Sequence, residues 1–200
     1  MRYKHGVYTI ITLLTEELLT LSFVDNILLL ATICDILKID NQALQTIAST
    51  VQLPSHRIEK VTSINNIDFY NDSKATTTAS TLAAVKKLHH RPLHLFLGGL
   101  SKGVDRTSFI AELKDYVKHI YCFGKEATIL HNMCNTYNIP SASFTTLTQA
   151  MEFCTQKLQA NDCILLSPAG SSYDLYENYE QRGNHFKELV ISYVQKMKNL

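Results

Sequence analysis

The spacing of apolar residues changes near Leu53-Pro54 and divides the chain there. Before this point, Ser22–Leu37 carries apolar residues at helical spacing, and Asn41–Val51 predicts a second short helix after a turn. Two helices cannot bury their own apolar faces well, so this first quarter is interpreted as the trailing part of a domain whose body lies elsewhere. A helical hairpin docked on the main domain is the alternative.

After Pro54, short apolar runs alternate with stretches of helical periodicity. This alternation is typical of βαβ units with right-handed crossovers. It predicts an α/β fold: a Rossmann-like, mostly parallel sheet flanked by helices. The expected strands are Ile67–Tyr70, Leu93–Leu97, His119–Phe123, Cys163–Leu166 and, more weakly, Ala142–Phe144, and the expected helices are Thr77–Leu88, Thr107–Val117, Ala127–Tyr137, Leu147–Gln159 and Tyr176–Met197.

Three polar, turn-rich segments each follow directly on one of these strands. They are Asn71–Thr76, Gly98–Asp105 and Ser167–Asp174. Ligands of open α/β sheets bind outside the carboxyl ends of the strands. If the sheet is parallel, the three segments share that edge and predict a binding site.

The segments contain side chains suited to an anionic small molecule. Lys74 and Lys102 supply positive charge, and Thr76, Ser171 and Ser172 supply hydroxyl donors. Glycines in the same segments allow backbone amides to approach a carboxylate or phosphate closely.

Simpler interpretations exist for each segment taken alone. Asp72 and Ser73 could cap a helix, Asp105 could cap the helix that follows it, and Gly98-Gly99 could form a tight turn. Two lysines in segments that reach the same edge favour a binding site over three unrelated turns.

Composition narrows the possible functions. The net charge is +1, from 19 basic and 18 acidic residues, without a basic stripe interleaved with aromatics, so no nucleic-acid partner is expected. The eight histidines are not at metal-ligand spacing, and no metal site is predicted. Five cysteines without a CxxC pair indicate buried free thiols in a reducing compartment. No run approaches the roughly 18–20 apolar residues that span a bilayer, so we expect a cytoplasmic protein without a membrane partner.

Two phosphate-binding patterns are absent from the sequence. Neither G-x-x-x-x-G-K-[ST] nor G-x-G-x-x-G occurs. Tight binding of ATP by this chain alone is therefore not expected, and a Rossmann dehydrogenase is disfavoured.

The three segments also carry a family resemblance. NDSKATT, LGGLSKGVD and LLSPAGSSYDLYENYEQRGNHF resemble, in order and spacing, the motifs of the Mur ligase family, and the last two resemble its D-glutamate-adding branch. The resemblance covers residues 54–198 well and residues 22–53 more weakly. It implies that residues 1–53 are the trailing part of the central ATPase domain and residues 54–200 are the carboxyl-terminal glutamate-ligase domain.

The resemblance implies an ATP-dependent, amide-forming ligase of peptidoglycan synthesis. ATP would convert the terminal carboxylate of UDP-N-acetylmuramoyl-L-alanine into an acyl phosphate, which the amine of D-glutamate attacks. The cofactors implied are ATP and Mg²⁺, with the Mg²⁺ ligands in the part of the family's sequence that this chain lacks, which is the amino-terminal domain and most of the central domain. Without the UDP-binding domain and the phosphate loop, the chain alone is expected to be inactive.

The resemblance assigns five residues to D-glutamate. Thr76, Lys102 and Ser172 would hold its carboxylates, and Tyr173 and Tyr179 would form the wall of its pocket. The two tyrosines stand where leucine and phenylalanine are usual in the family.

The resemblance assigns other residues to the nucleotide and to catalysis. Asp72 would reach the ribose and Lys74 the phosphates, and both are also the expected catalytic residues. Arg57 would contact ATP, and Asn26 would contact adenine. Arg182 matches a retained position, and a structural salt bridge is its alternative role.

Two further functions remain open at this point. The first is a non-catalytic module that binds a dicarboxylic amino acid or a partner protein. The second is a folylpolyglutamate synthetase, which is disfavoured because GGLSKGVD and EQRGNHF resemble the D-glutamate-adding branch.

Overall fold

The computed structural model describes residues 24–40, 42–43, 46 and 54–199. The chain separates into two compact units, Met1–Pro54 and Ser55–Leu200, and each is considered by itself. In the first unit, helix α3 spans Val24–Leu37 and exposes large apolar side chains such as Leu29 and Ile36. The second predicted helix, Asn41–Val51, falls mostly outside the described residues.

The second unit is built on one six-stranded sheet in the order β1-β2-β6-β3-β4-β5. Every neighbouring pair is parallel except β1 with β2. The predicted α/β fold with a mostly parallel sheet is therefore confirmed. The strands are β1 (Glu59–Ile64), β2 (Ile67–Asn71), β3 (Leu93–Gly98), β4 (His119–Phe123), β5 (Ser141–Phe144) and β6 (Cys163–Leu166).

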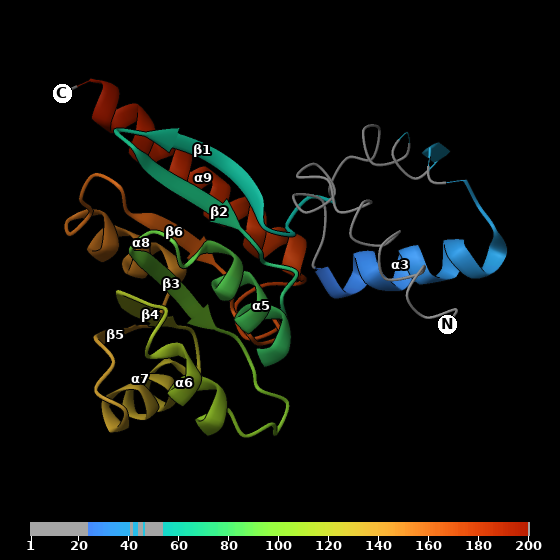
Figure 1. The fold of residues 1–200 in the computed structure, drawn as a ribbon. Coiled ribbons are helices and arrows are strands. Elements are labelled where there is room, and N and C mark those ends of the chain that lie inside the picture. Colours follow the sequence, from blue (N-terminus) through green and yellow to red (C-terminus); the bar gives the residue numbers. More distant parts are fainter. Residues whose placement is uncertain (1–23, 41, 44–45, 47–53, 200) are drawn as a thin grey trace. The chain divides into compact units, whose positions relative to one another are not determined.

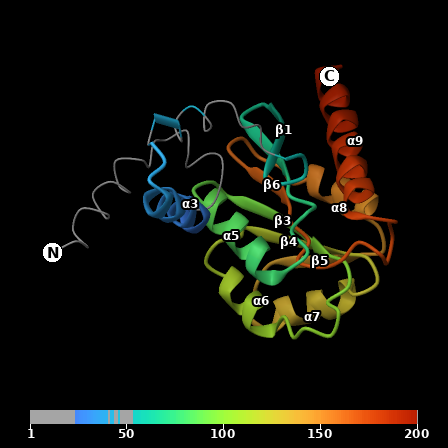
Figure 2. The ribbon, with the colours of Figure 1, turned by 90° about the vertical axis from the view of Figure 1, so that its right-hand side faces the viewer.

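Helices cover both faces of this sheet (Figures 1 and 2). A separate apolar core lies on each side of it. One core joins the sheet to α5, α6 and α7, and the other joins it to α8 and α9. β3 and β6 are buried at every position because helices cover both of their faces, as expected for central parallel strands. The helices are α5 (Thr78–Leu88), α6 (Thr107–Leu113), α7 (Ala127–Thr136), α8 (Leu147–Thr155) and α9 (Tyr179–Lys198).

The edge strand β1 was not predicted from the sequence. Its residues, EKVTSI, lack a continuous apolar run, and it pairs antiparallel with β2. The connection is the two-residue loop Asn65-Asn66, in which both residues have positive φ, 50° and 61°. Asparagine tolerates this conformation, and such two-residue loops match the twist of a hairpin. The Asn-Asn pair was the available signal.

Three helix boundaries were also predicted incorrectly. α6 ends at Leu113 rather than Val117, and α8 ends at Thr155 rather than Gln159. α9 begins at Tyr179 rather than Tyr176, because the side chain of Asn178 accepts a hydrogen bond from the Gln181 amide and caps the helix there.

A buried polar cluster lies at the amino ends of the central strands. The Asp162 carboxylate, 1% exposed, contacts His94 Nε2 at 3.0 Å and accepts a hydrogen bond from Lys118 Nζ at 2.8 Å. His94 Nδ1 contacts the Tyr121 hydroxyl at 2.9 Å. These groups satisfy one another within the core, at the end of the sheet opposite the three polar segments.

Two findings concern thiols and membranes. All five cysteines are buried free thiols, as predicted. Among the residues that the structure describes, no helix has the length and apolar character needed to cross a membrane.

Candidate functional site

The three polar segments meet at the carboxyl edge of the sheet. β6 lies between β2 and β3 and is parallel to both, so the segments after these strands are neighbours. The Ala169 amide donates to the Ala75 carbonyl at 3.1 Å, and the Gly98 amide donates to the Pro168 carbonyl at 3.0 Å. Leu100 and Ser171 exchange two backbone hydrogen bonds of 2.9 and 3.0 Å. The segment after β6 is thus bonded to both of its neighbours.

Glycine is required where the segments after β3 and β6 touch. A Cβ atom on Gly170 would lie 2.5 Å from the Gly98 carbonyl oxygen, and one on Gly99 would lie 2.3 Å from that of Ser171. Gly99 also has a positive φ of 72°. Any side chain at either position would push the two segments apart.

Arg182, on α9, joins the segments after β2 and β6 through hydrogen bonds to both. Its guanidinium donates to the Ser73 hydroxyl at 2.9 Å, the Ser73 carbonyl at 2.8 Å and the Gly170 carbonyl at 3.1 Å. The side chain is fully buried, and this burial lowers the pKa of Arg182 to about 10. All three acceptors are neutral, so Arg182 acts as a hydrogen-bonding cross-link rather than as the partner of a salt bridge.

Lys74, Tyr179 and the segment around Arg57 lie together at this edge. The Lys74 amide donates to the His56 carbonyl at 3.1 Å, and its Nζ lies 5.6 Å from the centre of the Tyr179 ring. The ring of His56 meets that of Tyr179 edge to face at 6.0 Å. Arg57 and Lys74 are exposed. The structure therefore presents two cations and an aromatic ring on one surface.

Asp72 is buried, and both of its carboxyl oxygens are bonded within the chain. Oδ1 accepts from the Ile58 amide at 3.1 Å, and Oδ2 accepts from the Ser167 hydroxyl at 2.8 Å. Burial raises the pKa of Asp72 to about 7, against the opposing effect of these hydrogen bonds. In this arrangement Asp72 ties the segment after β2 to that after β6. Only 4% of the residue is exposed, so little of its carboxylate is accessible to a ribose.

The residues assigned to D-glutamate differ in exposure. Ser172 is 3% exposed, Thr76 is partly buried, and Lys102 is exposed with a positive φ of 54°. Tyr179 is partly buried beside Lys74. Tyr173 is 68% exposed, so its side chain forms no wall of a closed pocket in this structure.

Asn26 belongs to the first unit, and its side chain lies outside the described part of the chain. Its expected contact with adenine stays a prediction.

Thr77, next to Thr76, caps α5 by accepting a hydrogen bond from the Ser80 amide at 3.3 Å.

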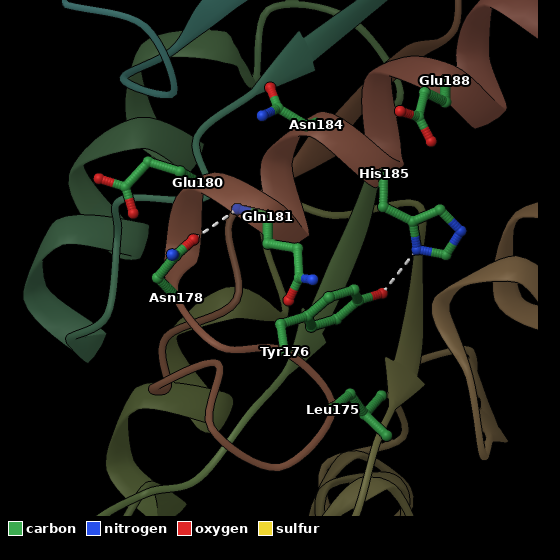
Figure 3. A pocket seen from close by; sticks show the side chains of 8 residues that line it. All are labelled: Leu175, Tyr176, Asn178, Glu180, Gln181, Asn184, His185 and Glu188. Carbon is green, nitrogen blue, oxygen red and sulfur yellow. Dashed lines mark hydrogen bonds between the residues drawn. The ribbon is translucent and has the colours of Figure 1, made fainter.

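A groove of about 700 Å³ runs along the start of α9 beside these segments (Figure 3). Its charged lining residues are the carboxylates Glu180 and Glu188, and neither lysine nor arginine lines it. The hydroxyl of Tyr176 contacts His185 Nδ1 at 2.8 Å on one side. This groove was not predicted, because it is formed by an ordinary polar helix face. Its charge is opposite to that of the surface around Lys74.

These features define a class of protein. An open, mostly parallel α/β sheet has three interlocked segments at its carboxyl edge, where Lys74 and Lys102 are exposed and Thr76 is partly buried. This arrangement is typical of a domain that binds a small anionic molecule. Among the described residues, no three His, Cys, Asp or Glu side chains are grouped as a metal site.

Comparison with known proteins gives the family. Residues 56–170 match the family described as Mur ligase, glutamate ligase domain, and the chain belongs to that family. It is 37% identical over 135 residues to a UDP-N-acetylmuramoylalanine–D-glutamate ligase from Pseudothermotoga lettingae, covering 68% of this chain and 31% of the relative. The enzyme of the same name from Francisella tularensis is 34% identical over 174 residues, covering 86% and 41%. The chain thus spans less than half the length of these relatives.

A solved structure supports the fold. The UDP-N-acetylmuramate-alanine ligase from Thermotoga maritima superimposes with a TM-score of 0.62 over 85% of this chain and 38% of its own, at 13% sequence identity. At that identity the likeness shows the fold alone.

Replacement of Arg182 by lysine tests the cross-link. Lysine carries the charge but cannot direct donors to the Ser73 and Gly170 carbonyls together. We expect Arg182→Lys to lower the free energy of unfolding by about 2–4 kcal/mol, because at least one buried carbonyl loses its partner. Urea denaturation followed by circular dichroism measures this change. The matched control, Arg57→Lys at an exposed position, should change stability by no more than about 0.5 kcal/mol. Equal losses in both variants would contradict the cross-link.

The pKa of Asp72 predicts a pH dependence of stability. Its folded pKa of about 7 lies above the ordinary value of 3.8, so its contribution is fully present below pH 3.8 and is lost as pH rises through about 7. Between these values wild type should lose stability relative to Asp72→Asn, by at most about 4 kcal/mol in total. Denaturation curves of both proteins from pH 4 to 8 measure the difference, in which the equal contributions of the histidines to the two proteins cancel. A difference independent of pH would show that Asp72 is not buried as an acid.

Proposed function

We propose that this chain binds D-glutamate for its ATP-dependent ligation to UDP-N-acetylmuramoyl-L-alanine in peptidoglycan synthesis. The observation that carries the proposal is the interlocking of the three motif segments at one sheet edge, where Lys74 and Lys102 are exposed. The names of the curated relatives support the substrate. We further propose that residues 1–53 are the trailing part of the central ATPase domain and residues 54–200 the carboxyl-terminal domain.

D-Glutamate brings two carboxylates and one amine to such a site. Lys102 would pair with a carboxylate, with the hydroxyls of Thr76 and Ser172 as further donors, and Tyr179 would pack against the carbon chain. Charge-assisted hydrogen bonds of this kind are roughly twice as strong as neutral ones. The amine is then left free to attack an activated carbonyl.

The nucleotide would lie beside Lys74. ATP supplies the phosphoryl group that activates the carboxylate of UDP-N-acetylmuramoyl-L-alanine as an acyl phosphate. Lys74 and Arg57 are exposed cations suited to phosphate oxygens, and Lys74 Nζ lies 5.6 Å from the centre of the Tyr179 ring. In the proposed reaction the neutral amine of D-glutamate attacks the carbonyl carbon of the acyl phosphate and a tetrahedral intermediate forms. The bond from this carbon to the phosphate oxygen then breaks, phosphate leaves, and the nitrogen loses a proton to solvent. Lys74 would stabilise the negative charge that develops in this step.

Other functions of the intact ligase belong outside the described residues. The sequence lacks the G-x-x-x-x-G-K-[ST] pattern of a phosphate loop, and the described acidic side chains do not gather as ligands for Mg²⁺. We propose that Mg²⁺, the phosphate loop and the UDP-binding surface are supplied by other parts of the ligase. The chain alone would then bind D-glutamate without turning it over.

Removal of the Lys102 ammonium tests the amino-acid site. We expect Lys102→Ala to weaken D-glutamate binding by about tenfold or more, because a hydrogen bond to a charged group is lost. Isothermal or NMR titration of the chain gives the dissociation constant, and in the complete ligase the same change should raise KM more than it lowers kcat. Lys114→Ala, at another exposed lysine, is the matched control. An unchanged affinity in Lys102→Ala would remove Lys102 from this role.

Binding and catalysis by the unaltered chain can be measured separately. Titration with D-glutamate should shift the amide NMR signals of Thr76, Lys102 and Ser172, and L-glutamate should shift them less. Phosphate release with ATP, UDP-N-acetylmuramoyl-L-alanine and D-glutamate should stay at the background rate. Phosphate release that depends on all three substrates would overturn the proposal that the chain alone binds D-glutamate without turning it over. Equal shifts with both enantiomers would instead favour a less selective module that binds dicarboxylic amino acids.

A further inference from the structure

Lys102 lies at the tip of a strained turn. The Val104 amide donates to the Ser101 carbonyl at 3.1 Å, which closes a four-residue turn over Lys102 and Gly103. Both central residues have positive φ, 54° and 79°, as in a type I′ turn. Glycine adopts this conformation freely, whereas lysine does so at a cost, so contacts outside the turn must hold it in place.

One carboxylate, that of Glu126, contacts residues at both ends of this turn. Its Oε1 accepts from the Ser101 amide at 3.1 Å and from the Ser101 hydroxyl at 3.3 Å. Its Oε2 accepts from the guanidinium of Arg106, which follows the turn. Arg106 is 2% exposed, so this is a largely buried ion pair. Glu126 thus fixes the residue that precedes Lys102.

Both partners stand at helix caps but do not cap their helices. Glu126 is the N-cap residue of α7 and Arg106 that of α6, and neither side chain makes a capping hydrogen bond. Glutamate is not among the residues preferred at an N-cap, so its place at the start of α7 does not by itself account for the contacts of its side chain. This side chain reaches from the segment after β4 to the segment after β3.

The same turn is also tied to the segment that carries Ser172. Leu100, just before the turn, exchanges two backbone hydrogen bonds with Ser171. Asp174 accepts from the Lys125 amide at 3.1 Å, which links the segment after β6 to the residue before Glu126. Three segments of the carboxyl edge, those after β3, β4 and β6, are therefore connected around Lys102.

We propose that Glu126 is a positioning residue for Lys102: through Ser101 it holds the turn that aims the Lys102 ammonium at a substrate carboxylate. Arg106 keeps the Glu126 carboxylate in place from the core side. This inference rests on the proposed role of Lys102 in binding D-glutamate. Glu126 itself touches no substrate.

Two substitutions at Glu126 separate positioning from stability. Glu126→Gln keeps an oxygen that can accept from Ser101 but removes the charge paired with Arg106, whereas Glu126→Ala removes both interactions. Both variants leave Arg106 buried without its ion pair, so both should lose stability. Only Glu126→Ala should release the turn. Glu112→Ala, which breaks the exposed ion pair with Lys86 on α5, is the matched control.

The experiment combines amide hydrogen exchange of the chain with D-glutamate titration. In Glu126→Ala we expect exchange at the Ser101 amide to rise about tenfold and the dissociation constant to rise about tenfold, since a hydrogen bond to a charged group is lost. In Glu126→Gln both should stay within about threefold of wild type. Glu112→Ala should change neither.

The outcomes decide the two proposals separately. Unchanged Ser101 exchange in Glu126→Ala would overturn the positioning role, even where Lys102→Ala weakens binding. Equal changes in both Glu126 variants, in proportion to their loss of stability, would show a purely structural role and overturn it as well. Accelerated Ser101 exchange together with unaltered binding in Lys102→Ala would support positioning of the turn and refute the proposed function of Lys102.

Discussion

The buried guanidinium of Arg182 is the interaction on which the carboxyl edge depends. A charge removed from water is costly unless hydrogen bonds replace its hydration. Arg182 obtains them from Ser73 and Gly170, which belong to segments nearly one hundred residues apart in sequence. Neither segment can move outward without leaving an arginine donor unpaired in the core. The positions of Lys74 and Ser172 follow from this constraint, because each lies within two residues of an Arg182 acceptor.

The parallel order of β2, β6 and β3 makes this cross-link possible. It brings segments that are remote in sequence into direct backbone contact, and glycine at positions 99 and 170 lets them approach. Asp72 adds a second tie, from the segment after β2 to Ser167. A network with so many backbone partners favours one arrangement of the surface, as preorganised recognition of a small anion requires.

The sequence was sufficient for the five strands other than β1 and for the three motif segments, because β2, β3 and β6 are mostly apolar and each is followed by polar turn residues. It was insufficient for β1, whose charged, half-exposed residues carry no strand periodicity. It also gave no sign of the bond between Glu126 and Ser101, since nothing in a local pattern shows that a helix-cap glutamate turns away from its own helix. The high exposure of Tyr173 and the burial of Asp72 are likewise properties of the folded packing, which motif resemblance does not encode.

Polar groups are paired within the protein at the amino ends of the strands, whereas two lysines at the carboxyl edge are not, and this contrast indicates where a ligand binds. At the amino ends, Asp162, Lys118 and His94 are arranged so that each polar group has a partner within the protein. At the carboxyl edge, within the described residues, Lys74 and Lys102 form no ion pair. Acidic residues are nevertheless close by, because Glu180 follows Tyr179 and Glu126 bonds Ser101, next to Lys102. Glu126 is instead bound to Arg106, which withholds its carboxylate from Lys102. A fold that engages nearby carboxylates elsewhere leaves these ammonium groups available to an anion from solution.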